Sequence, residues 1–290
     1  MKAVLIRDDD VSFFTDIRNL KKVYDKSFFN KGLKVSLSII PDVSSSLSIK
    51  GTNNSFARNG YLYEPFIPEN RINTGSYLFS KNKKVAAWMR KNESIEACIH
   101  GYSHALSEFT SNDKQYIGTL LNKGEKIIAS AVGKQKKLKT FVAPHERLSK
   151  TAWGVLSSRG FYIFRNIIRP LKDAFYTVPA GQYGLRHLQK QFFTGFNGIV
   201  RYRNGIEMGC MNPYLFSCFW DPEQSFEHAC AKFDKTDLFI MTNHHWEFPM
   251  NKKLLYWWKE FLKYMTEHEI RSFTAAEAVE LALTGRQTLL

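Results

Sequence analysis

Short apolar runs alternate with helical patterns along most of the chain, and this rhythm constrains the fold more than any other feature. The runs at 34–40 (KVSLSII) and 238–242 (LFIMT) have the length and composition of buried strands. Segments with helical periodicity follow such runs repeatedly. Strands that alternate with helices form parallel sheets joined by right-handed crossovers. About seven such units predict an α/β fold, a distorted (β/α)7-type barrel.

The predicted elements cover nearly the whole sequence. We predict strands at 2–7, 34–40, 94–99, 139–142, 161–164, 238–242 and 270–273, and helices at 16–29, 84–90, 113–132, 149–158, 252–268 and 275–283. Gly160 follows one of these helices and is predicted to be its C-cap. No repeat or linker divides the chain, so residues 1–290 are predicted to form one catalytic domain.

Two stretches break the rhythm, at about 44–82 and about 170–218. Both are rich in glycine and aromatic residues and have no regular periodicity. We interpret them as long loop insertions, which either shape a substrate groove or simply decorate the fold.

Four polar clusters each follow a predicted strand directly. They are Asp8-Asp9-Asp10, His100-Gly101-Tyr102-Ser103-His104, Pro144-His145-Glu146 and His244-His245-Trp246. In barrels of this kind the chemistry gathers where strands end and loops begin. The common position of the clusters therefore predicts one site.

The first two clusters have the residue types of a metal centre. Adjacent carboxylates repel one another, so a cation or a shared proton must compensate them if they are buried. One could bind a metal while its neighbour acts as a base; an exposed acidic turn is the alternative. Two histidines four residues apart can share one ion, although they could also be unrelated. A His/His/Asp set with open positions fits catalytic zinc or a similar divalent ion.

The other two clusters suggest groups that assist catalysis. Pro144 could aim backbone N–H groups at an oxyanion, or it could only make a rigid strand exit. A histidine at the end of a strand, His244 or His245, could act as a general acid. Packing in the core or exposure at the surface is the alternative for either histidine.

On these residues the sequence resembles the polysaccharide deacetylase superfamily, carbohydrate esterase family four. Asp9-Asp10 match its opening Asp-Asp motif, with Asp8-Asp9 as the other register, and "HGYSH" matches its His-x-x-x-His motif. Phe141–Pro144 and His244-His245 match two weaker motifs. The resemblance implies a distorted barrel in which Asp9 is the base, while Asp10, His100 and His104 hold a divalent ion, above all Zn²⁺.

The resemblance further implies hydrolysis of an N-acyl or O-acyl group on a sugar. The oxyanion would be held by the ion and an N–H near His145, and His244 or His245 would protonate the leaving group. Tyr102 and Trp246 could line the sugar site or pack in the core. Two alternatives remain: a catalytically degenerate saccharide-binding protein of the same fold, and another metal-dependent C–N amide hydrolase.

The sequence departs from the family pattern in three places. Val11 stands where a glycine usually follows the Asp pair. The arginine that commonly precedes the proline motif has no match, and Asp221 is only a weak match for the aspartate that orients the catalytic histidine. The pattern is most similar to a divergent branch associated with bacterial surface-polysaccharide loci, which implies a role in capsule, lipopolysaccharide or glycolipid biosynthesis.

Charge and hydropathy limit the partners. Lysine and arginine number 41 against 27 acids, a net charge of +14. This excess favours an anionic saccharide, linked to a nucleotide or a lipid phosphate, or a peripheral contact with a membrane surface. A solvated basic surface is the alternative, and nothing beyond charge indicates specific nucleic-acid binding. The sequence shows no secretory or transmembrane segment, and its four cysteines form no disulfide framework, so we expect a cytoplasmic protein.

Overall fold

A single curved sheet organises the molecule. The computed structural model describes residues 3–50, 55–165, 199–202, 205–209, 214–216, 230, 233 and 238–284. Its main sheet has the order β10-β11-β1-β2-β5-β6-β7-β9-β8, and β12 pairs with the beginning of β1. Among the described residues, every strand pair of this sheet is parallel except β8 with β9. The sheet curls into a half-barrel, as the alternation of strands and helices predicted.

The strands lie close to their predicted positions. The strands of the main sheet are β1 (Ala3–Val11), β2 (Val35–Ile39), β5 (Ile95–His100), β6 (Thr140–Val142), β7 (Tyr162–Arg165), β8 (Ile199–Tyr202), β9 (Gly205–Gly209), β10 (Tyr214–Phe216), β11 (Leu238–Asn243) and β12 (Arg271–Phe273). A separate antiparallel pair consists of β3 (Asp42–Ser44) and β4 (Ser76–Leu78).

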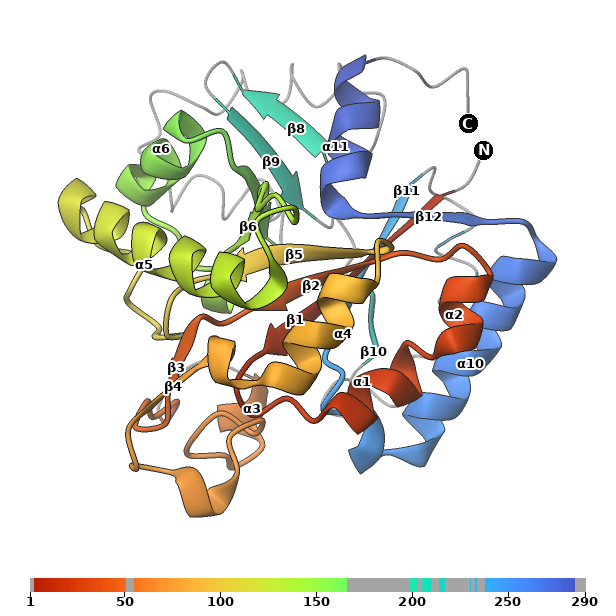
Figure 1. The fold of residues 1–290 in the computed structure, drawn as a ribbon, viewed down its shortest axis with the longest axis horizontal. Coiled ribbons are helices and arrows are strands. Elements are labelled where there is room, and N and C mark those ends of the chain that lie inside the picture. The colour runs from red at the N-terminus through yellow and green to blue at the C-terminus, as the bar shows by residue number, and fades with distance from the viewer. Residues whose placement is uncertain are drawn as a thin grey trace.

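Helices surround the sheet, as Figure 1 shows. The α-helices are α1 (Ile17–Val23), α2 (Lys26–Asn30), α3 (Ser55–Arg58), α4 (Lys83–Lys91), α5 (Lys114–Val132), α6 (Lys150–Ser158), α10 (Lys252–Glu267) and α11 (Ala275–Thr284). Short 3₁₀ turns are η1 (Glu69–Arg71), η2 (Phe79–Lys81), η3 (Pro144–Glu146) and η4 (Phe248–Met250). None of the helices among the described residues has both the length and the apolar content that a bilayer span needs.

The two faces of β1 belong to two different cores. Val4 and Ile6 pack in the larger cluster, together with residues of α1, α2, α4, α5, α6 and α10. Ala3 and Leu5 pack in a second cluster, which includes Val279 of α11. Successive side chains of a strand point to opposite faces, so this alternation assigns an outer face beneath the helices and an inner, concave face.

Side-chain caps explain where several helices begin. Asp113 accepts hydrogen bonds from two backbone N–H groups of α5, and Ser149 and Asn251 cap α6 and α10 in the same way. These caps satisfy N–H groups that have no partner within the helix. Gly160 has φ +78° just beyond α6, as predicted for a residue that ends a helix.

Three expectations about the elements need correction. The helix predicted at 16–29 is two helices, because Asp25 accepts a hydrogen bond from Phe28 N–H and starts α2 afresh. The first strand does not stop at Arg7 but continues through the three acids to Val11. Three strands, β8, β9 and β10, lie within 170–218, where only irregular structure was expected; the remainder of that segment, Cys218 and Asp221 lie outside the described residues.

The segment 44–82 also has structure of its own. Its β3–β4 pair is antiparallel, and Ser45 Oγ accepts hydrogen bonds from Thr74 and Gly75 N–H. In Figure 1 this segment lies beyond the end of the sheet toward which β1 and β5 point. It therefore sits at the carboxyl edge of the parallel strands.

Replacement of Trp258 by alanine tests the outer core. Trp258 on α10 is fully buried, packs against Tyr24 and Phe28, and donates from Nε1 to the carbonyl of Val23 at 2.9 Å. Trp258→Ala should lower the free energy of unfolding by about 3–5 kcal/mol, measured by urea denaturation. Tyr256→Ala, on the exposed face of the same helix, is the control and should change it by less than about 0.5 kcal/mol. Equal losses in the two variants would contradict this packing.

Candidate active site

Three consecutive carboxylates lie buried in the second half of β1, and the pleat sends them in different directions. Arg7 and Asp9 share the inner face, and the Arg7 guanidinium lies 4.6 Å from the Phe164 ring, which belongs to the inner cluster. Asp8 points to the outer face, where it meets Tyr24. Asp10 follows a register shift and has φ +64°, so it leaves the alternation.

Asp10 faces the two histidines of the HGYSH segment. Its Oδ1 lies 3.4 Å from His100 Nε2 and 3.3 Å from His104 Nε2. Its Oδ2 accepts a hydrogen bond from Trp246 Nε1 at 3.2 Å and lies 3.7 Å from His244 Nε2. These histidines outweigh the effect of burial and hold the pKa of Asp10 far below its usual range. Asp10, His100 and His104 thus form a group, within the described part of the chain, that could hold a metal ion.

The tautomer of His100 suits a metal ligand. Its Nδ1 lies 3.1 Å from the carbonyl oxygen of Val142, which can only accept, so Nδ1 carries the proton. The neutral ring then has its lone pair on Nε2, the nitrogen that faces Asp10. A partner on the far ring nitrogen is what fixes a ligand histidine in most metal sites.

Glu108 holds the HGYSH segment in shape. Its carboxylate accepts hydrogen bonds from the backbone N–H groups of Tyr102 and Ser103 and from the Ser103 hydroxyl. Gly101 has φ +63°, and a Cβ there would lie 2.1 Å from Glu108 Oε1 and 2.3 Å from Pro144 Cγ. The close approach of these groups therefore requires glycine at position 101.

Asp9 is tethered by an arginine of its own strand. Arg7 Nε lies 2.9 Å from Oδ1 and 3.0 Å from Oδ2 of Asp9, and Arg7 Nη2 bonds Oδ2 as well. Glu146 is a second partner, 3.3 Å from Arg7 Nη2. Burial favours the neutral acid, but the charges of Arg7 and His100 outweigh it and lower the pKa of Asp9. Asp9 therefore remains ionised at neutral pH.

His244 has a buried carboxylate partner three residues later. Its Nδ1 lies 2.8 Å from Glu247 Oε1, and its Nε2 points toward Asp10. Burial lowers its pKa, but the hydrogen bond and charge of Glu247, with the charge of Asp10, raise the pKa of His244 to about 10. A divalent ion beside Asp10 would lower this pKa again.

His245 turns away from Asp10 and pairs with Asp8. Both its backbone N–H and its Nδ1 donate to Asp8 Oδ1, at 3.1 and 2.8 Å. The Tyr24 hydroxyl donates to Asp8 Oδ2 at 2.7 Å and accepts from Asn243 Nδ2 at 3.2 Å. Asp8 therefore serves a buried network on the outer face of the sheet and does not face the HGYSH histidines.

The remaining expected site residues have distinct places. Pro144 is buried and begins η3, where His145 and Glu146 have φ of +49° and +61°. His145 Nε2 donates to the His104 carbonyl at 3.0 Å. The Tyr102 hydroxyl donates to Asp42 on β3 at 3.1 Å, so this side chain braces the loop.

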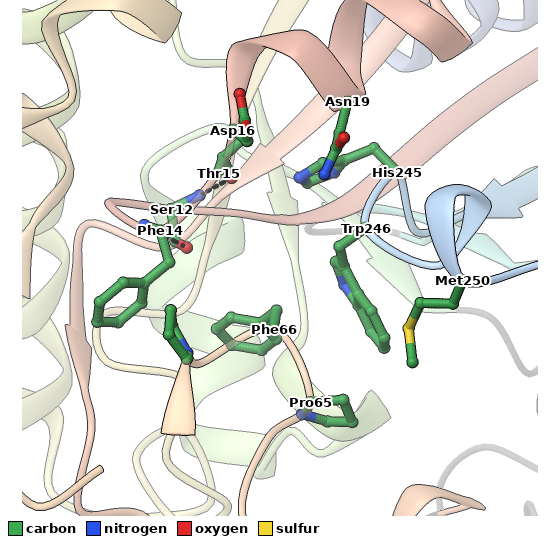
Figure 2. A pocket seen from close by; sticks show the side chains of 11 residues that line it. Ser12, Phe14, Thr15, Asp16, Asn19, Pro65, Phe66, His245, Trp246 and Met250 are labelled. Carbon is green, nitrogen blue, oxygen red and sulfur yellow. Dashed lines mark hydrogen bonds between the residues drawn. The ribbon is translucent and has the colours of Figure 1, made fainter. Parts of the chain in front are cut away.

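Figure 2 shows the lining of a pocket that includes Trp246, whose Nε1 donates to Asp10; Asp10 itself does not line the pocket. Its volume is about 180 Å³, and its walls come from the start of α1, from residues 65–68 and from 245–250. Of the four residues expected to bind substrate, Trp246 lines it, across from Phe66 in Figure 2. Ser12, Thr15, Asp16 and Asn19 add polar groups.

Sequence reasoning missed four acidic or basic residues of this site. Arg7, Glu64, Glu108 and Glu247 are all buried there, and none of them was assigned a chemical role from the sequence. The sequence could have indicated Arg7 and Glu247, because they stand beside the Asp8-Asp9-Asp10 and His244-His245 clusters. Glu64 reaches the site through the tertiary fold, whereas Glu108 bonds Tyr102 and Ser103 a few residues earlier in the same loop.

The fold and the site together define an α/β half-barrel with a candidate metal centre at the carboxyl ends of its strands. No protein-family model matches the sequence, and no curated protein matches it. Solved structures do match. A family 4 acetyl xylan esterase from Clostridium thermocellum, in complex with a cobalt ion, is 12% identical with a TM-score of 0.52, over 98% of this chain and 92% of that one.

Two other structures are similar to the same extent. A peptidoglycan deacetylase from Bacillus subtilis is 10% identical with a TM-score of 0.50, over 99% of this chain and 93% of that one. A carbohydrate esterase family 4 pseudoenzyme from Bacillus anthracis is 9% identical with a TM-score of 0.52, over 96% of this chain and 65% of that one. This chain therefore has the fold of the carbohydrate esterase family 4 polysaccharide deacetylases, as its motifs implied.

Gly101→Ala tests the construction of the HGYSH segment. The added methyl group cannot fit between Glu108 and Pro144, so the variant should lose about 1–3 kcal/mol of unfolding free energy. Gly154→Ala is the matched control, since Gly154 is exposed in α6 with nothing within 4 Å of a new Cβ, and it should gain up to about 1 kcal/mol. Urea denaturation measures both, and an unaltered Gly101→Ala protein would refute this account.

Proposed function

We propose that this protein is a metal-dependent hydrolase that removes an N-acyl or O-acyl group from a sugar. The observation that carries the proposal is the convergence of Asp10, His100 and His104, with Asp9 and His244 beside them. These five residues come from the ends of three different strands, β1, β5 and β11. The metal-ligand group, a tethered carboxylate and a paired histidine are the parts that such a hydrolysis needs.

The donor set fits a divalent ion, and Zn²⁺ suits it best. Two imidazoles and one carboxylate are the ligands that catalytic zinc commonly uses, with positions left for water and substrate. The proton of His100 lies on Nδ1, so its Nε2 is available as a ligand. When bound, such an ion supplies Lewis acidity, which polarises the acyl carbonyl and lowers the pKa of a water molecule.

Asp9 is the base in this proposal. Arg7 fixes its carboxylate by two nitrogens, so its orientation is set before substrate arrives. The ionised carboxylate can accept a proton from the attacking water. Arg7 thereby fills the place of the arginine that the family pattern puts before the proline motif.

His244 is the acid, and Glu247 positions it. With Nδ1 held by Glu247, Nε2 is the nitrogen that can donate a proton to the leaving amine or alcohol. Glu247 thus takes the orienting role for which Asp221 is only a weak match in the sequence. The N–H of Glu146 donates to Ala143, so the N–H of His145 is the donor that we propose for the oxyanion.

An acylated saccharide suits the pocket that Trp246 and Phe66 line. Sugar rings present apolar faces that stack on aromatic side chains, and Trp246 and Phe66 supply such faces here. The net charge of +14 supports a saccharide that carries a nucleotide or lipid phosphate. We place the reaction in the biosynthesis of surface polysaccharide or glycolipid, in the cytoplasm.

A saccharide-binding protein without activity is the second candidate. The similarity of fold to a family 4 pseudoenzyme motivates it. Arg7 and Glu247 weigh against it, because they occupy the roles that the family's unmatched arginine and aspartate would have. Metal analysis of the purified protein separates the two proposals, since a binding relic need not retain one ion per chain.

Variants of Asp9 and Asp10 should lose activity for different reasons. Asp10→Ala removes a ligand, so the purified protein should lose its ion and its activity together. Asp9→Asn should keep the ion and lose turnover by about 10²–10⁴-fold. Elemental analysis measures the ion, and acetate release from acetylated xylan, peptidoglycan and N-acetylated oligosaccharides measures turnover. Full activity in Asp9→Asn would remove Asp9 from the role of base.

Variants of the two adjacent histidines, His244 and His245, should also differ in their effects on kcat and on stability. His244→Ala should lower kcat by about 10²–10⁴-fold with the fold intact, because Nε2 is the proposed proton donor. His245→Asn should cost about 1–3 kcal/mol of stability and lower kcat far less than His244→Ala does, because His245 bonds buried Asp8 and lines the pocket but does not face Asp10. Steady-state kinetics and urea denaturation distinguish the two. The reverse pattern would assign the acid to His245.

A further inference from the structure

We propose that Glu64 is a positioning residue for the metal ligand His104. In the loaded site its carboxylate accepts a hydrogen bond from His104 Nδ1–H, and this fixes the ring with Nε2 toward Asp10. The inference rests on the proposed metal centre and adds to it a residue from the segment 44–82, which the family motifs do not include.

Glu64 is a buried acid without a donor. Its side chain is 3% exposed, and neither carboxylate oxygen has a hydrogen-bond partner among the described residues. His104 Nδ1 likewise has no hydrogen-bond partner within the described part of the chain. The two groups face each other, with Oε1 3.6 Å from Nδ1. A buried carboxylate and a buried ring nitrogen that are both unsatisfied at this distance need only a small movement to bond.

When His104 binds an ion through Nε2, its ring proton must lie on Nδ1, where it can bond Glu64. His104 Nε2 points at Asp10 and must offer a lone pair if it is to bind an ion. The neutral ring then carries its proton on Nδ1, on the side of Glu64. His100 has the same arrangement, with Val142 O in place of the carboxylate. The two ligand histidines would therefore each have an acceptor behind them.

A second cation between Glu64, His104 and His145 is the rival explanation. These three residues also form a group that could hold an ion. His145 Nε2, however, lies 3.0 Å from the carbonyl oxygen of His104. A carbonyl only accepts, so this nitrogen carries a proton and has no lone pair for an ion. The observations favour the positioning role.

The position of Glu64 connects the pocket wall to the metal centre. Pro65 and Phe66 follow it directly, and both line the pocket shown in Figure 2. The Phe66 ring lies 5.7 Å from the His104 ring. The same short stretch therefore contacts the substrate side of the site and the back of a metal ligand.

Zinc affinity of Glu64 variants tests the role without reference to turnover. Glu64→Leu removes the acceptor and should weaken Zn²⁺ binding by about 10–100-fold, while Glu64→Gln retains a neutral acceptor and should lose less. Competition with a chromophoric chelator measures both, on the full chain. Glu69→Gln is the matched control, since Glu69 is an exposed acid of the same segment, and its affinity should equal that of the wild type.

Stability of the metal-free proteins separates positioning from a merely structural role. Because neither carboxylate oxygen of Glu64 has a hydrogen-bond partner among the described residues, and the nearest histidine nitrogens lie 3.6 Å away, Glu64→Leu without metal should be at least as stable toward urea as the wild type. The inference would be overturned if Glu64→Leu were less stable than the wild type without metal and bound zinc as tightly as the wild type. Two ions per wild-type chain, falling to one in Glu64→Leu, would establish the second cation instead. A wild-type chain that binds no zinc would defeat the metal centre itself.

Discussion

Burial of three adjacent carboxylates in one strand is the constraint on which the rest of the site depends. Each acid has a different compensating partner: Asp8 has Tyr24 and His245, Asp9 has Arg7, and Asp10 has the histidines and Trp246. The pleat of β1 separates Asp8 from Asp9, and the register shift releases Asp10 from the alternation. Unequal surroundings give three like residues three different roles.

In the proposed site, the partners of the base and of the acid come from positions that differ from those in the family pattern. Arg7 stands two residues before the acid that it holds, and Glu247 stands three residues after the histidine that it holds. Both are local partners on the same strand or turn, whereas the family pattern places such partners on other segments of the chain.

Several residues of the segment 44–82 lie at the candidate site. The segment supplies Glu64 behind His104, Phe66 in the pocket wall and Asp42 nearby as a partner for Tyr102. The β3–β4 pair joins the chain at the beginning of this segment to the chain near its end. Variation within this segment would therefore alter the substrate pocket and the metal centre together.

The sequence by itself determined the succession of strands and helices and the edge of the sheet at which the polar clusters meet. Periodicity and caps are local properties, so Asp113, Ser149 and Gly160 could be interpreted correctly from neighbouring residues alone. Only the tertiary structure decided which acid faces which histidine, because that depends on the register of β1 and on its bulge. It also decided the place of Glu64, since a buried carboxylate carries no mark in the sequence of the distant groups that surround it.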